Sequence, residues 1–252
     1  MTPRGKSGVG LIALMVLAPL AARAGGLDIA PVNVELKPSE TSGFVTLHNG
    51  GGDTLRFEVK LTVWTQGKDG QIVTEPSRAL VWFPELFVLK PGESRHIRVG
   101  TTPEQFGEVE KTYRMFITEL PAPAGAPGPQ VRVLTQLGVP IFLAPKNGGQ
   151  AKAELTAPQL EAGAVTFSLR NPGLVHLKTK RTTLEALGEG DAPLSQKSWD
   201  GWYVLAKGER EYREAVPKDL CAKVRKLQAT VEIDGVAPLT ATLPVPQGAC
   251  AP

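Results

Sequence analysis

Alternation of apolar and polar residues is the dominant pattern along the chain. Between residues 55 and 63, apolar side chains stand at every second position with polar ones between them. A period of two is typical of a strand with one face on a core and the other in solvent. The same alternation recurs at Val45/Leu47, Ile97/Val99 and Tyr113/Met115/Ile117. Glycine-, asparagine- and proline-rich turns separate these runs, so the pattern predicts an all-β sandwich or barrel.

Turn-rich segments predict how the chain is divided. The proline-rich stretch 121–129 is interpreted as a loop within the first domain, because the strand that follows it is needed to complete a sheet. A boundary is expected at 144–149, after which alternation resumes. At about 100 residues per immunoglobulin-like sandwich, the 252 residues hold two such domains beside an export signal. We therefore predict β-sandwich domains at 25–146 and 147–252.

The first 24 residues have the pattern of a secretory signal. Arg4 and Lys6 precede an apolar run from Val9 to Ala22, and a small-x-small motif then places cleavage after Ala24. The alternative, a membrane anchor, requires about 20 apolar residues, and the run is shorter. We expect an exported, soluble mature chain without membrane insertion.

Composition and motifs narrow the class of protein. A net charge of +3 gives no basis for nucleic-acid binding. Hydrolytic, nucleotide-binding and zinc motifs are absent, and Gly50–Gly52 lies in a predicted hairpin turn and not between a strand and a helix. The three histidines, His48, His96 and His176, are far apart in sequence. We expect no enzyme, no metal and no cofactor.

The chain has two cysteines, Cys221 and Cys250. For an exported protein the favoured interpretation is one disulfide that closes the last part of the second domain. A redox-active pair is less favoured because there is no C-x-x-C motif.

Segments spread over the mature chain resemble, in order, the periplasmic pilus-assembly chaperones, and most closely the branch that serves archaic or spore-coat-like pili. The matching segments are 29–36, 45–49, 63–66, 89–100, 113–121, 139–145, 170–177 and 203–208. The resemblance implies two immunoglobulin-like domains in a boomerang arrangement, a periplasmic location, and one-to-one complexes with pilus subunits. It also implies delivery of those subunits to an outer-membrane usher.

The resemblance further implies that one strand is lent to the client. Pilus subunits are incomplete sandwiches, and the chaperone strand fills the empty groove by β-augmentation. In the segment 130–142 one face carries the candidate donor residues Val131, Val133, Thr135, Leu137 and Val139. Alternatively, this row packs in the core of its own domain, and the period is the same in both cases.

A second implied element is a cationic anchor for the client's C-terminal carboxylate. The family has an arginine where this chain has Asn33, and a lysine near the position of Pro140, and neither of these residues is charged. The cation we predict in their place is Arg114, which is out of phase with the core positions of its strand, followed by Lys146 at the domain boundary. Asn33 is kept as the third candidate residue of the anchor site. Either cation has the alternative of being an ordinary solvated side chain.

Two other functions remain open at this point. A carbohydrate-binding or adhesive module would use aromatic side chains as a stacking platform, for which the candidates are Trp64, Trp82, Phe83 and Trp202. A related chaperone that serves surface polymers other than pili is also compatible with the residues.

Overall fold

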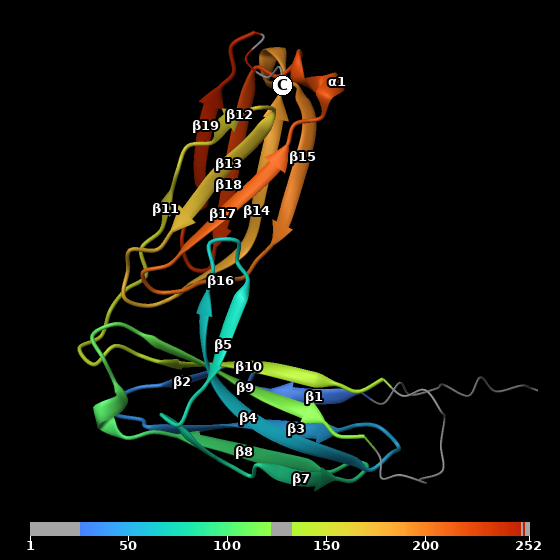
Figure 1. Cartoon of the computed structure of the whole chain (residues 1–252), viewed down its shortest axis with the longest axis vertical. Helices are drawn as coiled ribbons and strands as arrows, with labels where there is room; N and C mark the ends of the chain where they lie inside the picture. Colours follow the sequence, from blue (N-terminus) through green and yellow to red (C-terminus); the bar gives the residue numbers. More distant parts are fainter. Residues whose placement is uncertain (1–25, 122–132, 248, 250–252) are drawn as a thin grey trace, which may run out of the picture.

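The computed structural model describes residues 26–121, 133–247 and 249. The predicted signal peptide, residues 1–24, therefore lies outside the described residues. The regular structure of the described chain is nearly all strand, with only short helical pieces, and it forms two sandwiches of facing sheets, which confirms the predicted fold class. The two sandwiches are joined as an L in Figure 1, and the predicted boundary at 146/147 falls in the connection between the last strand of one and the first strand of the other.

The N-terminal sandwich has a four-stranded and a six-stranded sheet. The first has the order β1 (Leu27–Ala30), β3 (Ser42–Asn49), β8 (Ser94–Gly100), β6 (Val81–Phe83). The second has the order β2 (Val34–Leu36), β10 (Gln136–Leu143), β9 (Lys111–Glu119), β4 (Leu55–Gln66), β5 (Ile72–Pro76), and β7 (Leu86–Leu89) also pairs with β4. A single 3-10 turn, Pro103–Gln105, precedes β9.

The C-terminal sandwich is built in the same way. In its first sheet β13 (Ala164–Arg170) pairs with β11 (Glu154–Leu155), β12 (Gln159–Glu161) and β17 (Glu209–Ala215). Its second has the order β15 (Pro193–Asp200), β14 (Leu177–Leu187), β18 (Lys226–Ile233), β19 (Leu239–Pro244), and β16 (Tyr203–Val204) pairs with β14. The two short helical pieces are the 3-10 turn Glu189–Asp191 and helix α1 (Lys218–Cys221).

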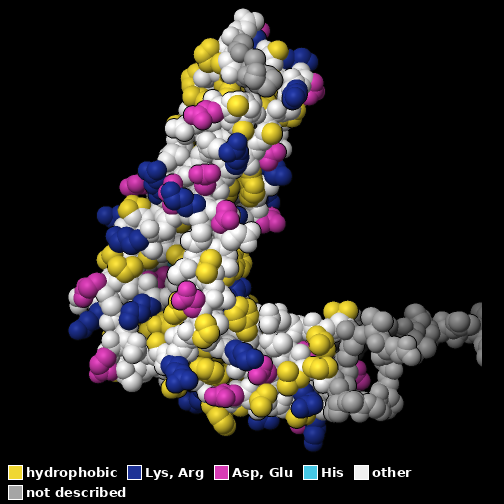
Figure 2. Space-filling model, viewed as in Figure 1, with side chains coloured by type: hydrophobic (Ala, Val, Ile, Leu, Met, Phe, Trp, Pro, Cys, Tyr) yellow, Lys and Arg dark blue, Asp and Glu magenta, His cyan; other side chains and the backbone are white. Residues whose placement is uncertain are grey.

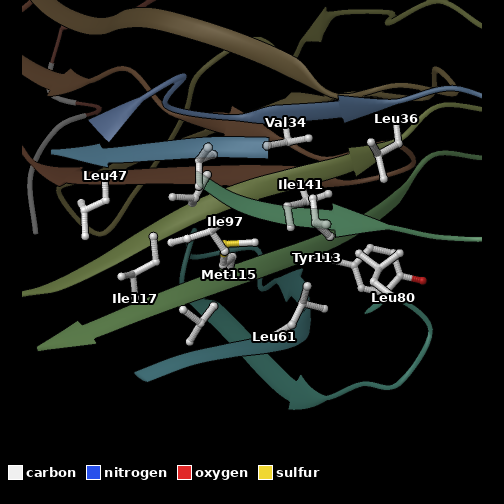
Figure 3. Packing of buried hydrophobic residues seen from close by; sticks show 14 of the residues in the cluster. Val34, Leu36, Leu47, Leu61, Leu80, Ile97, Tyr113, Met115, Ile117 and Ile141 are labelled. Atoms are coloured by element: carbon white, nitrogen blue, oxygen red, sulfur yellow. The ribbon is translucent and has the colours of Figure 1, made fainter. Parts of the chain in front are cut away.

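Alternation along the strands directs apolar side chains between the sheets. On β4 the predicted core positions Phe57, Val59 and Leu61 are buried, and Figure 3 shows Leu61 near its cross-strand neighbour Met115 on β9 in the same core. Burial of such apolar surface is the main favourable term in folding, at about 25 cal/mol per Å². The alternating pattern therefore identified the inward face of this strand correctly.

Aromatic side chains fill the junction between the two sandwiches. Trp64 has the parity of the solvent-facing positions of β4, yet it is fully buried, because Phe142, Tyr203 and Leu205 cover it. The β4–β5 hairpin rises against the second sandwich (Figure 1). There the Glu211 amide donates to the Lys68 carbonyl at 2.7 Å.

A carboxylate–imidazole contact closes the junction on a second side. The Glu110 carboxylate accepts hydrogen bonds from the His176 backbone amide and contacts the His176 ring at 3.0 Å. The imidazole also stacks on Phe142, with centroids 3.9 Å apart. Polar and apolar contacts therefore hold the two sandwiches together.

The structure also bears on the cysteines, on membrane-spanning helices, on metal-binding groups and on the distribution of charge. Cys221, on α1, is disulfide-bonded, whereas Cys250 lies outside the described residues. Within the described ranges, no helix is long and apolar enough to cross a membrane. The same residues contain no group of three or more His, Cys, Asp or Glu side chains arranged to hold a metal. Basic and acidic side chains are interspersed over the face shown in Figure 2.

Candidate functional site

Strand β10 has one edge that is only partly covered. It pairs with β9 along its whole length, from Gln136 to Leu143. On its other side β2 pairs with it in parallel, and only at 141–143. In the described part of the chain, residues 136–140 therefore have no strand beyond them. Such an edge is a template for an added strand.

The predicted donor row passes from the core into solvent along this strand. Val139 is 3% exposed and belongs to the core of its own domain, and Leu137 packs against that core. Thr135 is half-buried, whereas Val133 is 87% exposed. The change occurs because β9 ends at Glu119, opposite Thr135, so that Val133 extends beyond the sandwich. Val131 lies outside the described residues.

Arg114 lies on the outer face of the same sheet, beside the free part of β10. It is paired across the ladder with Pro140, and its Nη2 donates to the Gly138 carbonyl at 3.3 Å. Its Nε and Nη1 are covered, and neither has a hydrogen-bond partner among the described residues. A buried donor without a partner costs about 1–3 kcal/mol, and more when it is charged.

Glycine at position 138 makes this arrangement possible. A Cβ there would stand 2.6 Å from Arg114 Nε, closer than two such atoms can approach without displacement. The guanidinium therefore occupies space that a side chain on β10 would otherwise fill.

Three aromatic rings surround the Arg114 guanidinium. Its Cζ lies 5.6 Å from the ring centre of Trp64, 5.9 Å from that of Phe116 and 5.7 Å from that of Trp202. These distances are within the range of cation–π attraction. The first two rings come from the same sheet as Arg114, and Trp202 comes from the second sandwich.

Burial is the main influence on the titration of this group. It lowers the pKa of Arg114 from its ordinary value, an effect that the Tyr203 phenol opposes. Burial also raises the pKa of Tyr203, and the nearby guanidinium opposes that rise. Because the pKa of arginine ordinarily lies far above neutrality, the side chain remains a cation at physiological pH.

The other two predicted anchor residues are placed differently. Lys146 is exposed in the turn after β10, where its backbone amide donates to the Gly107 carbonyl at 2.7 Å. Asn33 is half-buried just before β2. Of the three, Arg114 is the one whose buried side-chain donors have no partner among the described residues.

The aromatic platform considered for a sugar does not form one exposed surface. Trp64 is fully buried, and Trp82 packs against the core with its Nε1 donating to the Val59 carbonyl at 3.1 Å. Phe83, 75% exposed, lies on β6, away from Trp202 at the junction. The sequence singled out Trp64 and Trp202 but not their contact with Arg114.

Comparisons with known proteins agree with this fold. The model of the pili and flagellar-assembly chaperone family, PapD N-terminal domain, matches residues 26–148. No curated protein sequence matches the chain significantly. Among solved structures, the chain is similar to one from a complex of the chaperone CsuC with the tip adhesion subunit CsuE, from archaic Csu pili of Acinetobacter baumannii. That match has 17% identity, a TM-score of 0.59, and covers 86% of this chain and 97% of the other.

Two further structures give similar values. The Escherichia coli chaperone DraB is 16% identical, with a TM-score of 0.53, over 88% of this chain and 97% of the other. A chain from the complex of the Salmonella enterica pilin SafA with the chaperone SafB is 12% identical, with a TM-score of 0.54, over 89% of this chain and 99% of the other. At these identities the likeness establishes the fold.

Proposed function

Since residues 26–148 match the model of the pili and flagellar-assembly chaperone family, we propose that the chain is a pilus-assembly chaperone and captures incomplete pilus subunits by lending them a strand. The strand would be the stretch that leads into β10. A client would add its own edge strand to residues 136–140, and the side chains before them would enter its groove. The product is a one-to-one complex.

The exposed fraction of the side chains falls from Val133, before β10, to Val139, within it, and this supports lending of the stretch before β10. Val139 stabilises the chaperone's own core and is not lent, while Val133 is exposed and free to enter a client. Val131 and Thr135 share the parity of Val133 and complete the proposed donor row. Leu137 is intermediate between the core residue Val139 and the exposed Val133, because it is only partly buried against the core.

The single observation that carries the proposal is the state of Arg114. A cation with two buried, unpaired donors stands beside the open strand edge, and no described residue pairs a carboxylate with it. A carboxylate suits this group, because the only hydrogen bond that the guanidinium makes among the described residues is the one from Nη2 to the Gly138 carbonyl, and a carboxylate accepts strong hydrogen bonds from a cation. We propose that Arg114 anchors the client's C-terminal carboxylate. Lys146 and Asn33 have at most a supporting part.

The proposal includes the cellular setting. The chain would act in the periplasm after removal of residues 1–24, on clients of archaic-type pili, and would pass them to an outer-membrane usher. Hand-over needs a surface that stays free while β10 is occupied. The exposed apolar side chains of β6 and β7 provide one, at the edges away from β10: Val81, Phe83, Leu86 and Val88.

The test is capture of pilus subunits in the periplasm, with tagged chain purified from its native host and its partners identified by mass spectrometry. Val133→Asp would place a charge in the client groove, and Arg114→Ala would remove the anchor. Each should lower the yield of one-to-one complex about tenfold or more. Arg114→Ala loses a charged hydrogen bond, which contributes about 1.5–3 kcal/mol, and Val133→Asp buries a carboxylate without a partner, which is costly. Val236→Asp and Arg56→Ala are matched controls at exposed positions.

The outcomes separate the parts of the proposal. Unchanged capture by Arg114→Ala rules out the anchor, and unchanged capture by Val133→Asp rules out strand lending. A chain that copurifies with no subunit but is retained on glycan resin is a carbohydrate-binding module. If the copurified partner is a subunit of a surface polymer other than a pilus, strand lending stands as the mechanism and the class of client is different.

A further inference from the structure

The guanidinium of Arg114 is held by groups from both sandwiches. Trp64 and Phe116 belong to the sheet that carries Arg114, whereas Trp202 follows β15 in the second sandwich. On the remaining side, Gly138 accepts one hydrogen bond from Nη2. The orientation of the anchor is therefore set partly by a residue from outside its own domain.

The backbone of Trp202 is fixed by hydrogen bonds to Thr179. The carbonyl of Trp202 accepts hydrogen bonds from both the amide and the hydroxyl of Thr179, and the Trp202 amide donates to the same hydroxyl, each at 2.9 Å. Thr179 is only 3% exposed. Gly201 lies against the Thr179 carbonyl so closely that a Cβ there would collide with it. Three hydrogen bonds and a tight backbone approach thus fix the backbone of Trp202 at the junction, and its indole packs against the Tyr203 ring with centroids 5.4 Å apart.

The rings orient the cation without neutralising it. An aromatic face attracts a guanidinium through its quadrupole, whereas a carboxylate at the same place would consume the donors that a client needs. The described residues within reach of Arg114 supply rings and one carbonyl, and no ion pair with it is formed among them. Its charge is not neutralised, and its buried Nε and Nη1 have no hydrogen-bond partner among the described residues.

We propose that Trp202 is a positioning residue for Arg114, so that the carboxylate anchor is complete only when the two sandwiches are docked. This inference rests on the proposed function of Arg114. Fixing the guanidinium in advance lowers the ordering cost of binding. Replacement of Trp202 should therefore weaken carboxylate binding while the donor strand stays intact.

The experiment follows the Arg114 Nε–H resonance in protein labelled with 15N-arginine, assigned with Arg114→Lys. The probes are N-acetylglycine, a minimal C-terminal carboxylate, and N-acetylglycinamide, its neutral counterpart. In the native chain the acid should shift the resonance saturably and the amide should not. Trp202→Ala should weaken apparent binding of the acid about fivefold, the size expected for one cation–π contact.

Two further variants keep the test decisive. Trp202→Phe retains a ring and should bind the acid within about twofold of the native chain, because phenylalanine also offers a π face. Trp202→Met keeps apolar volume without a ring and should behave like Trp202→Ala, which covers the case in which the alanine variant does not fold. Backbone amide spectra of each variant report on the fold.

Each result has one meaning. If the native chain discriminates acid from amide and the alanine and methionine variants do so equally well, Trp202 does not position Arg114, although the anchor stands. Tighter binding by these variants would mean that the indole obstructs the cation, which also overturns the inference. If the native chain shows no carboxylate-dependent shift, the proposed anchor itself is wrong.

Discussion

Single polar residues fix the turns that shape both sandwiches. Asn171 is fully buried, and its amide nitrogen donates to three backbone carbonyls while its oxygen accepts from the amides of Lys152 and Gly173. Asn49 has a similar task in the first sandwich, with bonds to Asp53 and the Leu89 carbonyl. Burial of such groups is tolerated because their hydrogen bonds are made.

Asn171→Ala should therefore destabilise the protein strongly. The change leaves several buried backbone groups without partners, and we expect a loss of about 3 kcal/mol in the free energy of unfolding. Urea denaturation followed by circular dichroism measures it. Asn147→Ala, at an exposed site, is the control and should cost little; equal losses in both variants would contradict this account.

Gly138→Ala tests the space beside Arg114. The new Cβ would displace the guanidinium, so client capture should fall by about tenfold, comparable with the loss of one charge-assisted contact. Pull-down from periplasm measures capture. Gly148→Ala is unsuitable as a control because its φ is +75°, whereas Gly26, with open space around it, is a suitable site. Normal capture by Gly138→Ala would show that Arg114 can relocate.

At the scale of the element, β10 and the residues just before it lie in two different environments. Its C-terminal part is covered by β2 and packs in the core, and the segment before it extends past the end of β9. Two valines of the same parity, Val133 and Val139, therefore have different roles.

Because Val139 packs in the core and Val133 is exposed, alanine variants at these two positions should differ in their effects on stability and on client capture. Val139→Ala should lower the free energy of unfolding by about 2 kcal/mol through the cavity it leaves. Val133→Ala should change stability by less than about 0.5 kcal/mol, yet weaken client capture. Chemical denaturation and pull-down together measure the two effects, and a comparable loss of stability in both variants would refute the division.

The sequence predicted the strands and their inward faces well, because alternation reports directly on which face is buried. It could not locate the point at which the row in β10 leaves the core, since a donor row and a core row share one period. The outward direction of Arg114 followed from its parity on β9. Its contact with Trp202 did not, because that contact depends on how two separately folded sandwiches dock.

At the scale of the whole molecule, the L shape depends on an aromatic junction and a few polar ties. Tyr203, 8% exposed, contacts Trp64 and Phe142 across the junction. Lys68, on the β4–β5 hairpin, forms an ion pair with Glu209 of β17 at 3.4 Å. Loss of either contact should loosen the docking without unfolding either sandwich.

Tyr203→Ala should give a larger radius of gyration in small-angle scattering, because the two sandwiches would sample wider angles. It should also weaken client capture, since Trp202 would no longer be held against Arg114. Phe83→Ala, at an exposed aromatic on β6, is the control for scattering. An unchanged radius for Tyr203→Ala would show that the polar contacts alone fix the angle.

Acid should act on the same junction through Glu209. A hydrogen bond from Ser168, with further contributions from Arg170 and Lys68, lowers the pKa of Glu209. A carboxylate whose pKa is lower in the folded state contributes stability above its unfolded pKa and loses it as the pH falls through the folded value. Glu209→Gln should therefore flatten the decline of the thermal midpoint between about pH 5 and about pH 3. An identical decline in both proteins would contradict this.

Two of the four tryptophans, Trp64 and Trp202, lie against the guanidinium, while Trp82 and Trp199 lie elsewhere. The emission of an indole depends on the electric field across its ring, and a carboxylate that neutralised the neighbouring cation would change that field. Arrival and departure of a client should thus alter the intrinsic fluorescence of the chaperone itself. Loading and release could then be timed in a stopped-flow instrument, with unlabelled protein and in real time.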